Sequence, residues 1–189
     1  MAFVLLLASC AAPYQVEQST DKFSDPNQPE IYRLTHNKIM SDYLGVAADD
    51  ELRPFVMRNR ESGKVVTAGV DLIVSNTSAG IAGDYLMIRP GDKLIFLADG
   101  ERIELKAVAS DIDHTVSTPL ASVYVTRRDE ARYLMTAEQL EQIAFATKLE
   151  FKAQGRNSYA TWPRTNFTIM TSFRDNLKRF YNEQVRPFL

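Results

Sequence analysis

The residues best suited to metal chemistry lie in one polar stretch of the chain. Asp111 and Asp113 are alternate carboxylates and His114 follows directly, within Val108–Pro119, which shows no clear period and is predicted to be an irregular connection. Carboxylate oxygens on a loop can bind a divalent cation, but a calcium site needs six or more oxygens. The stretch also lacks the glycine and terminal glutamate of an EF-hand loop. We therefore predict a solvated turn, and no metal or other cofactor. If a metal ion did bind, Asp111, Asp113 and His114 would be its candidate ligands.

Catalysis finds little support in the sequence. His36 and His114 are the two histidines, and neither accompanies a G-x-S-x-G or S-x-x-K motif. Catalytic carboxylate pairs are defined by their separation in space, and 24 acidic residues allow many pairs. We expect His36 to be a surface or hydrogen-bonded structural residue, predict no catalytic residue, and regard a hydrolase as the least favoured class of function.

Four side chains near the end of the chain are suited to recognition. Arg156, Tyr159, Trp162 and Arg164 fall in one predicted loop, and aromatic and guanidinium groups are enriched at interaction hot spots. In the alternative, Trp162 anchors the loop against a sheet, and Pro163 favours this because it restricts the backbone of the residue before it. The sequence predicts candidate binding residues and leaves both interpretations open.

The first ten residues end in the single cysteine of the chain. An apolar run leads into Leu6-Leu7-Ala8-Ser9-Cys10, with small side chains beside the point where a signal segment is cut. This pattern resembles the lipobox of bacterial lipoproteins. The resemblance implies that residues 1–9 are a signal peptide and that Cys10 carries acyl chains such as palmitate. Ala11, in place of aspartate, is similar to lipoproteins of the outer membrane that face the periplasm.

Two features of this segment bear on that interpretation. The first basic residue is Lys22, so we expect a basic segment to precede Met1 in the complete signal peptide. The alternative is a buried N-terminal strand with an incidental cysteine. A transmembrane helix needs about 20 apolar residues, and the run here is less than half as long.

Composition indicates an ordinary globular protein. The chain of 189 residues is 45% hydrophobic and 24% charged, which does not fit a disordered chain. A net charge of −2 argues against nucleic acid as the main partner, because such domains usually carry a concentrated basic surface. With one cysteine, neither an intramolecular disulfide nor a cysteine zinc cluster can form.

The polar segment Ala11–Gln28 is predicted to be a tether, so that residues 10–28 comprise the lipidated cysteine and the tether. Residues 29–189 are expected to form a single domain. It would open with a helix over Pro29–Leu44, since proline fits a first helical turn and Gly45 fits a C-terminal stop.

Most of the domain is predicted to be antiparallel strands. Asp99-Gly100 between two strand-like runs predicts a type I′ hairpin, with Ala98 opposite Glu101 and Phe96 opposite Ile103. One face of this hairpin is apolar and the other only partly so. The remaining expected strands are 55–59, 65–74, 85–88, 122–127, 131–135, 149–153 and 167–170.

Two helices are predicted late in the chain. Thr136 with Gln139 fits a capping box that opens a short helix to about Thr147. A C-terminal helix over about 172–185 has Phe173, Leu177, Phe180 and Tyr181 at helical spacing, which favours a core-facing stripe over a partner-binding one. The class is α+β, a mostly antiparallel β-sheet or sandwich with these two helices.

The leading hypothesis is a lipid-anchored accessory protein of the bacterial envelope that binds a partner protein and performs no chemistry. Its expected partners are the membrane, through Cys10, and an envelope protein, but not nucleic acid. The alternative is a small-ligand or glycan-binding module that uses the loop of Tyr159 and Trp162.

Replacing Cys10 with alanine should release the protein from membranes. Each acyl CH₂ buried in lipid contributes about 0.8 kcal/mol, and stable anchoring takes more than one chain. Fractionation after a carbonate wash measures the effect. If Cys10→Ala stayed with the membranes, the lipobox interpretation would be wrong.

Overall fold

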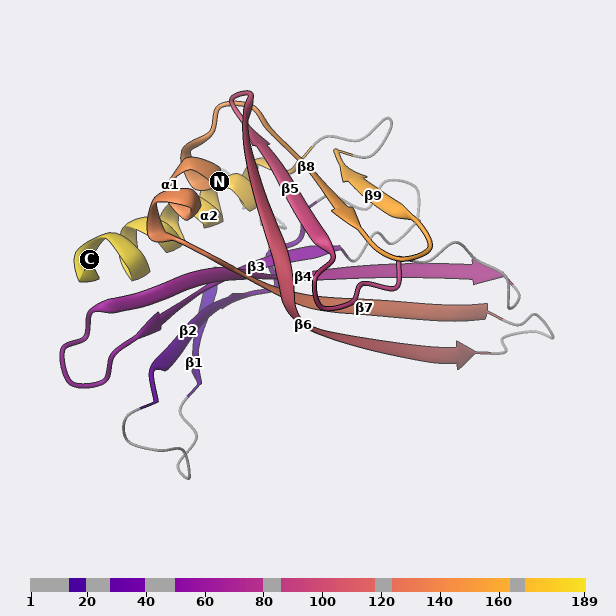
Figure 1. Ribbon diagram of the computed structural model, residues 1–189, viewed down its shortest axis with the longest axis horizontal. Helices are drawn as coiled ribbons and strands as arrows, with labels where there is room; N and C mark the ends of the chain where they lie inside the picture. Colours follow the sequence, from indigo (N-terminus) through magenta and orange to yellow (C-terminus); the bar gives the residue numbers. More distant parts are fainter. Residues whose placement is uncertain (1–13, 20–27, 40–49, 80–85, 118–123, 164–168) are drawn as a thin grey trace, which may run out of the picture.

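The protein folds around one large, bent antiparallel sheet. The computed structural model describes residues 14–19, 28–39, 50–79, 86–117, 124–163 and 169–189. Nine strands are hydrogen-bonded in the order β1-β2-β3-β4-β7-β6-β5-β8-β9, and two α-helices pack against one side (Figure 1). This arrangement confirms the predicted α+β class with a mostly antiparallel sheet. None of the helices in these ranges is long and apolar enough to cross a membrane.

The elements follow in chain order. The strands are β1 (Gln15–Ser19), β2 (Glu30–Thr35), β3 (Glu51–Arg58), β4 (Val65–Ala79), β5 (Lys93–Ala98), β6 (Glu101–Ser117), β7 (Tyr124–Met135), β8 (Leu149–Gln154) and β9 (Tyr159–Trp162). The helices are α1 (Ala137–Phe145) and α2 (Thr171–Phe180), the latter continued by a π-helical turn η2 (Tyr181–Val185) and a 3₁₀ turn η3 (Arg186–Phe188).

Strand β6 belongs to both halves of the bent sheet. Its first half pairs with β5 and its second half with β7, and the register shifts between Ala107 and Ala109. Val108 is therefore the extra residue of a β-bulge, which bends a strand and increases its twist. We call β5, β8, β9 and the first half of β6 the small leaf, and β1–β4, β7 and the second half of β6 the large leaf. Figure 1 shows the small leaf rising from the large one.

The helices fill the angle between the two leaves. Thr136 Oγ1 accepts from the backbone N–H of Gln139 at 3.2 Å, and Gln139 Oε1 accepts from the N–H of Thr136 at 3.0 Å, so the predicted capping box is confirmed. Helix α1 contacts α2, β4 and β5. The C-terminal helix buries its predicted apolar stripe, which lies in the same core as the inward residues of the small leaf: Phe173, Leu177, Phe180 and Tyr181 with Leu94, Phe96, Leu149 and Phe151.

The β5–β6 hairpin has the predicted turn and register. Asp99 and Gly100 have φ of 52° and 89°, and Ala98 pairs with Glu101. The Asp99 carboxylate also accepts from the backbone N–H of Lys148 at 2.7 Å and of Thr147 at 3.0 Å, which lowers its pKa. The turn thus fixes the connection from α1 to β8 as well as its own hairpin.

Two expectations for the first part of the domain were wrong. The predicted helix over Pro29–Leu44 begins instead with β2, which lies between β1 and β3 and pairs with both, and residues 40–44 lie outside the described ranges. Within the predicted tether, Gln15–Ser19 form the edge strand β1. Four of its five side chains are exposed, so it carries no apolar alternation for sequence reasoning to detect. Residues 1–13, including Cys10, and 20–27 lie outside the described ranges.

Three expectations in the middle of the chain also need correction. Val108–Pro119 is not irregular: β6 continues to Ser117, paired with β7. The two strands expected around residues 128–130 are one strand, β7: these residues pair with both β4 and β6, and Asp129 is buried, where it accepts from the backbone N–H of Ile88 at 3.3 Å. Residues 86–88 of the expected strand 85–88 form no strand, and Met87 has a φ of 53°. Of the last expected strand, 167–170, residues 167 and 168 lie outside the described ranges.

Replacing Gly100 with valine should destabilise the fold. A β-branched residue at a φ of 89° costs on the order of 1–3 kcal/mol, which should lower the melting temperature of the purified protein. Gly100→Asn is the matched control, because asparagine tolerates positive φ far better. Equal melting temperatures for Gly100→Val and the parent would contradict the positive φ of Gly100 in the β5–β6 turn.

Candidate functional site

Trp162, one of the predicted binding residues, belongs to the core. It is 1% exposed, and its ring stacks on Phe151 with the centroids 4.9 Å apart. The indole Nε1 donates to Asp50 Oδ2 at 3.0 Å, and Asp50, itself fully buried, accepts a second bond from the backbone N–H of Ser75. The expected loop is strand β9, and Trp162 anchors it as in the alternative interpretation. It is not exposed to a partner.

The other predicted binding residues differ in position. Strand alternation places Tyr159 and Thr161 on the side of β9 opposite to Trp162, and Tyr159 is 64% exposed. The Nζ of Lys152 lies 3.8 Å from the centroid of the Tyr159 ring. Arg156 lies in the turn after β8, whereas Arg164 is outside the described ranges.

The turn that carries Arg156 is held by the segment before β5. The backbone N–H of Arg156 donates to Met87 O at 3.3 Å, and that of Asn157 donates to Leu86 O at 3.4 Å. A Cβ on Gly155 would lie 1.9 Å from Leu86 O, so the close approach requires glycine there. This packing fixes the turn relative to the small leaf.

The side of the small leaf that faces away from the helices is the candidate site, and we call it the outer face. The inward residues of its strands are in the core, so the alternate residues point outward. The register brings these outward residues into adjacent rows across four strands. They are Arg102, Glu104 and Lys106 from β6, Lys93, Ile95 and Leu97 from β5, Glu150, Lys152 and Gln154 from β8, and Tyr159 and Thr161 from β9.

Two hollows lie along these strands. The larger, of about 530 Å³, is lined by aliphatic side chains of Ile95 and Leu97 and by polar side chains that include Arg102, Lys152 and Thr161. Leu97 is 39% exposed. The second hollow, of about 440 Å³, is polar and lies between residues 91–93 and 154–159. The outer face therefore combines an apolar floor with polar groups around it.

The outer face carries more positive than negative charge. Among its residues, four cations (Lys93, Arg102, Lys106 and Lys152) stand against the carboxylates of Glu104 and Glu150, whereas the whole chain has a net charge of −2. Glu104 accepts from Lys93 Nζ at 2.7 Å and from Arg102, and these hydrogen bonds lower its pKa. Such a surface attracts an acidic partner.

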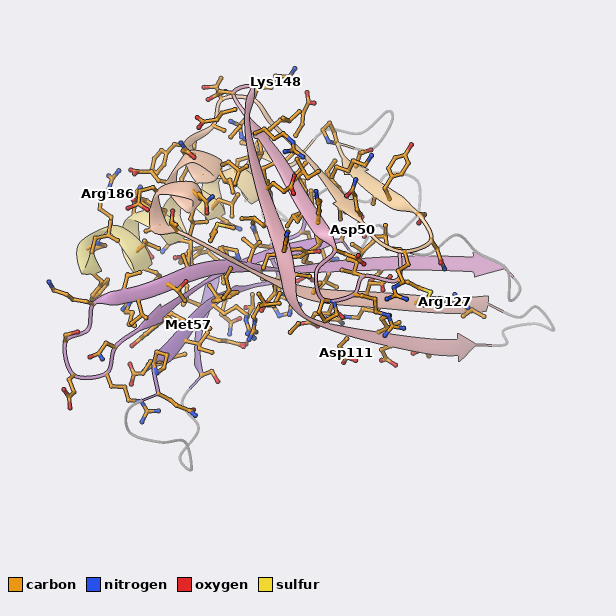
Figure 2. All side chains as sticks on the ribbon, in the orientation of Figure 1. Asp50, Met57, Asp111, Arg127, Lys148 and Arg186 are labelled. Carbon is orange, nitrogen blue, oxygen red and sulfur yellow. The ribbon has the colours of Figure 1, made fainter. Side chains whose placement is uncertain are left out.

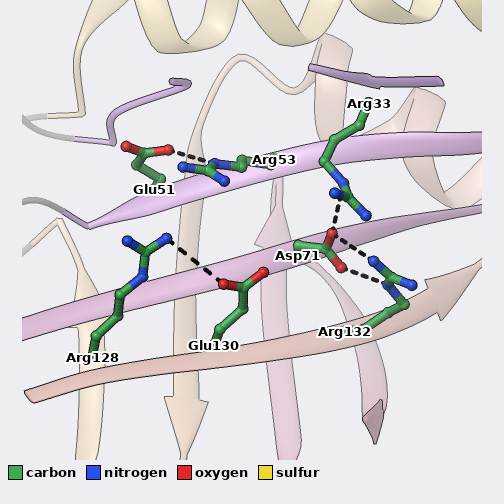
Figure 3. A network of polar contacts seen from close by, with 7 residues as sticks. All are labelled: Arg33, Glu51, Arg53, Asp71, Arg128, Glu130 and Arg132. Carbon is green, nitrogen blue, oxygen red and sulfur yellow. Dashed lines mark hydrogen bonds and ion pairs between the residues drawn. The ribbon is translucent and has the colours of Figure 1, made fainter. Parts of the chain in front are cut away.

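A polar network on the large leaf, on the side away from the helices, has a structural role (Figure 3). Asp71 is 1% exposed, and its carboxylate lies 2.9 Å from Arg33 Nε and accepts from Arg132 Nε at 2.8 Å and Nη2 at 3.1 Å. The bond to Asp71 raises the pKa of Arg132. The guanidinium of Arg132 also lies 4.9 Å from the centroid of Phe55, which is fully buried over Gly69. The two arginines thus compensate a buried charge, and Arg132 also covers an aromatic ring.

The metal candidates lie on β6. Asp111 and Asp113 are exposed, and their register partners on β7 are Glu130 and Arg128, while His114 is paired with Arg127. Within the described ranges, no three His, Cys, Asp or Glu residues are grouped so that they could hold a metal ion. The predicted turn is wrong, because these residues extend a strand. His36, at the end of β2, is exposed, as expected of a surface histidine.

Sequence reasoning missed several residues of the outer face. The hairpin register predicted from Asp99-Gly100 already placed Leu97 opposite Arg102 on the partly apolar face, and this was the sequence signal for these two residues. The pairing of β5 with β8 gave no such signal, because the two strands are far apart in the sequence; it adds Lys152 to that face. Asp50 was also missed, since its partners are distant in the chain.

Comparison with known proteins adds nothing to this geometry. No family model matches the chain, and no match was found among curated proteins or among solved structures.

Truncating Trp162 should destabilise the fold in two steps. Trp162→Phe keeps an aromatic ring but removes a donor from buried Asp50, at a cost of about 1–3 kcal/mol. Trp162→Ala also leaves a cavity, and we expect about 3–5 kcal/mol. Denaturant unfolding measures both. Tyr159→Ala on the same strand is the control and should stay within about 0.5 kcal/mol of the parent, since its ring is largely exposed. A Trp162→Ala protein as stable as this control would contradict the anchoring role.

Proposed function

We propose that the chain is a lipid-anchored accessory protein of the bacterial envelope, which binds a partner protein through the outer face and performs no chemistry. The observation that carries the proposal is the outer face itself, which has an apolar floor and more cations than carboxylates on a chain that is negative as a whole. The anchor is supported by the lipobox-like sequence Leu6-Leu7-Ala8-Ser9-Cys10.

The outer face indicates the chemistry of the partner. Ile95 and Leu97 offer apolar contact, with Arg102 and Lys152 beside them. Arg102 pairs with Glu104, but over the whole outer face the cations outnumber the carboxylates. An acidic surface that carries an exposed apolar side chain would complement both features, since interfaces combine an apolar centre with a polar rim. The site residues lie on paired strands, which hold such groups more firmly than loops do.

A small-ligand or glycan-binding module is the second candidate, and the polar hollow favours it. Exposed Tyr159 stands there beside Arg156, Asn157 and Asp92. An exposed aromatic ring among hydrogen-bonding groups could stack on a sugar. The aliphatic floor of the larger hollow has no part in that function, which is why protein binding is preferred.

Site-specific photo-crosslinking in cells tests the proposal. A benzophenone amino acid at position 97 should give a discrete protein adduct of the full lipidated chain. Position 134 on β7 is a matched control, because Leu134 and Leu97 are both leucines with 39% exposure. We expect no adduct from position 134.

Charge reversal makes the test specific. Arg102→Glu with Lys152→Glu should abolish the adduct from position 97, while Lys64→Glu in the exposed β3–β4 turn should not. Equal adducts from positions 97 and 134, or an adduct that survives the double reversal, would reject the outer face as the interface. Absence of any adduct, together with saturable sugar binding that Tyr159→Ala removes, would favour the second candidate.

A further inference from the structure

The first described residue is attached to the C-terminal helix. The Tyr14 ring lies 4.0 Å from the guanidinium carbon of Arg179, and its hydroxyl is buried. Burial, and then the neighbouring Glu183 carboxylate, raise the pKa of that hydroxyl. Strand β1 begins at the next residue, Gln15, whose carbonyl accepts from Thr35 Oγ1 at 3.2 Å. The position of Tyr14 relative to α2 and η2 is therefore fixed from both sides.

Only Ala11, Ala12 and Pro13 separate Tyr14 from Cys10. A fully extended chain spans at most about 3.6 Å per residue, so the Cα atoms of residues 10 and 14 can be no more than about 14 Å apart. An acylated Cys10 lies at the bilayer surface. The Tyr14–Arg179 contact must then lie within about that distance of the lipid headgroups, since no long tether intervenes.

The C-terminal helical segment next to this contact contains more cations than carboxylates. Residues 171–189 contain Arg174, Lys178, Arg179 and Arg186 against Asp175 and Glu183. The side chains of Arg179 and Arg186 are 56% and 57% exposed, and they pair with Glu183 at 2.8 Å and with Glu141 of α1 at 3.1 Å. Basic groups held close to a membrane are attracted to anionic headgroups.

We infer that the exposed side of α2 and η2 rests on the bilayer and contacts anionic lipid headgroups. The inference rests on the proposed lipid anchor and adds the orientation of the domain. In Figure 1 the C-terminal end of this helix lies on the opposite side of the molecule from β9. A membrane-bound helix therefore leaves the β9 side of the outer face accessible to a partner in the periplasm.

Fluorescence quenching on vesicles tests the orientation in the full lipidated chain. Because Cys10 is blocked by its lipid, a bimane label can be placed on a second cysteine at position 182 in η2 or at position 111 in β6. Asn182 and Asp111 are both exposed, and Figure 2 shows Asp111 on the lower side of the molecule, away from Arg186 at the upper left. The vesicles are phosphatidylethanolamine with phosphatidylglycerol and a lipid that carries a nitroxide on its headgroup. We expect strong quenching at position 182 and little at position 111.

Charge variants and salt test whether the contact with the headgroups is electrostatic. Lys178→Glu with Arg186→Glu should reduce the quenching at position 182, and so should high salt or the omission of phosphatidylglycerol. Equal quenching at both positions, or none at position 182, would overturn the inference while the protein still floats with the vesicles. A chain whose Cys10 carries no lipid by intact mass, and which does not float, would overturn the proposed anchor and this inference with it.

Discussion

The hydrogen bond from the Trp162 indole to Asp50 is the interaction on which the closure of the fold depends. A buried carboxylate is costly unless donors compensate it, and Asp50 receives the indole N–H and the Ser75 N–H. These donors come from β9, the last strand of the small leaf, and from β4 in the large leaf. The bulge at Val108 bends the sheet, and the Asp50 contact fixes the bent leaves around the helices, so the outer face is held as a defined surface.

The same strand that closes the core also shapes the candidate site. Since Trp162 points inward, alternation turns Tyr159 and Thr161 outward, beside Lys152 of β8. The proposed binding surface therefore uses side chains that the core does not need, on strands that the core holds in place. The contact of Tyr14 with the C-terminal helix lies elsewhere on the domain, which separates the proposed anchoring surface from the proposed binding surface.

Local signals in the sequence predicted local structure well. Asp99-Gly100 specified a hairpin and its register, and Thr136 with Gln139 specified the start of α1, because neighbouring residues decide these features. Edge strand β1 was not predictable, since a mostly exposed strand carries no apolar alternation. The candidate site also divides into local and long-range features. Arg156 and Tyr159 were found as neighbours in sequence, whereas Lys152 joins them only through strand pairing. The inward direction of Trp162 depends on Asp50, 112 residues away.

The most direct test of this account is the fluorescence of the single tryptophan in the folded protein. If Trp162 closes the core against Asp50 and Phe151, its emission should be blue-shifted relative to tryptophan in water, and iodide should quench it only weakly. A red-shifted emission that iodide quenches as readily as in the unfolded chain would contradict the closure, and would return the tryptophan to the surface as a recognition residue.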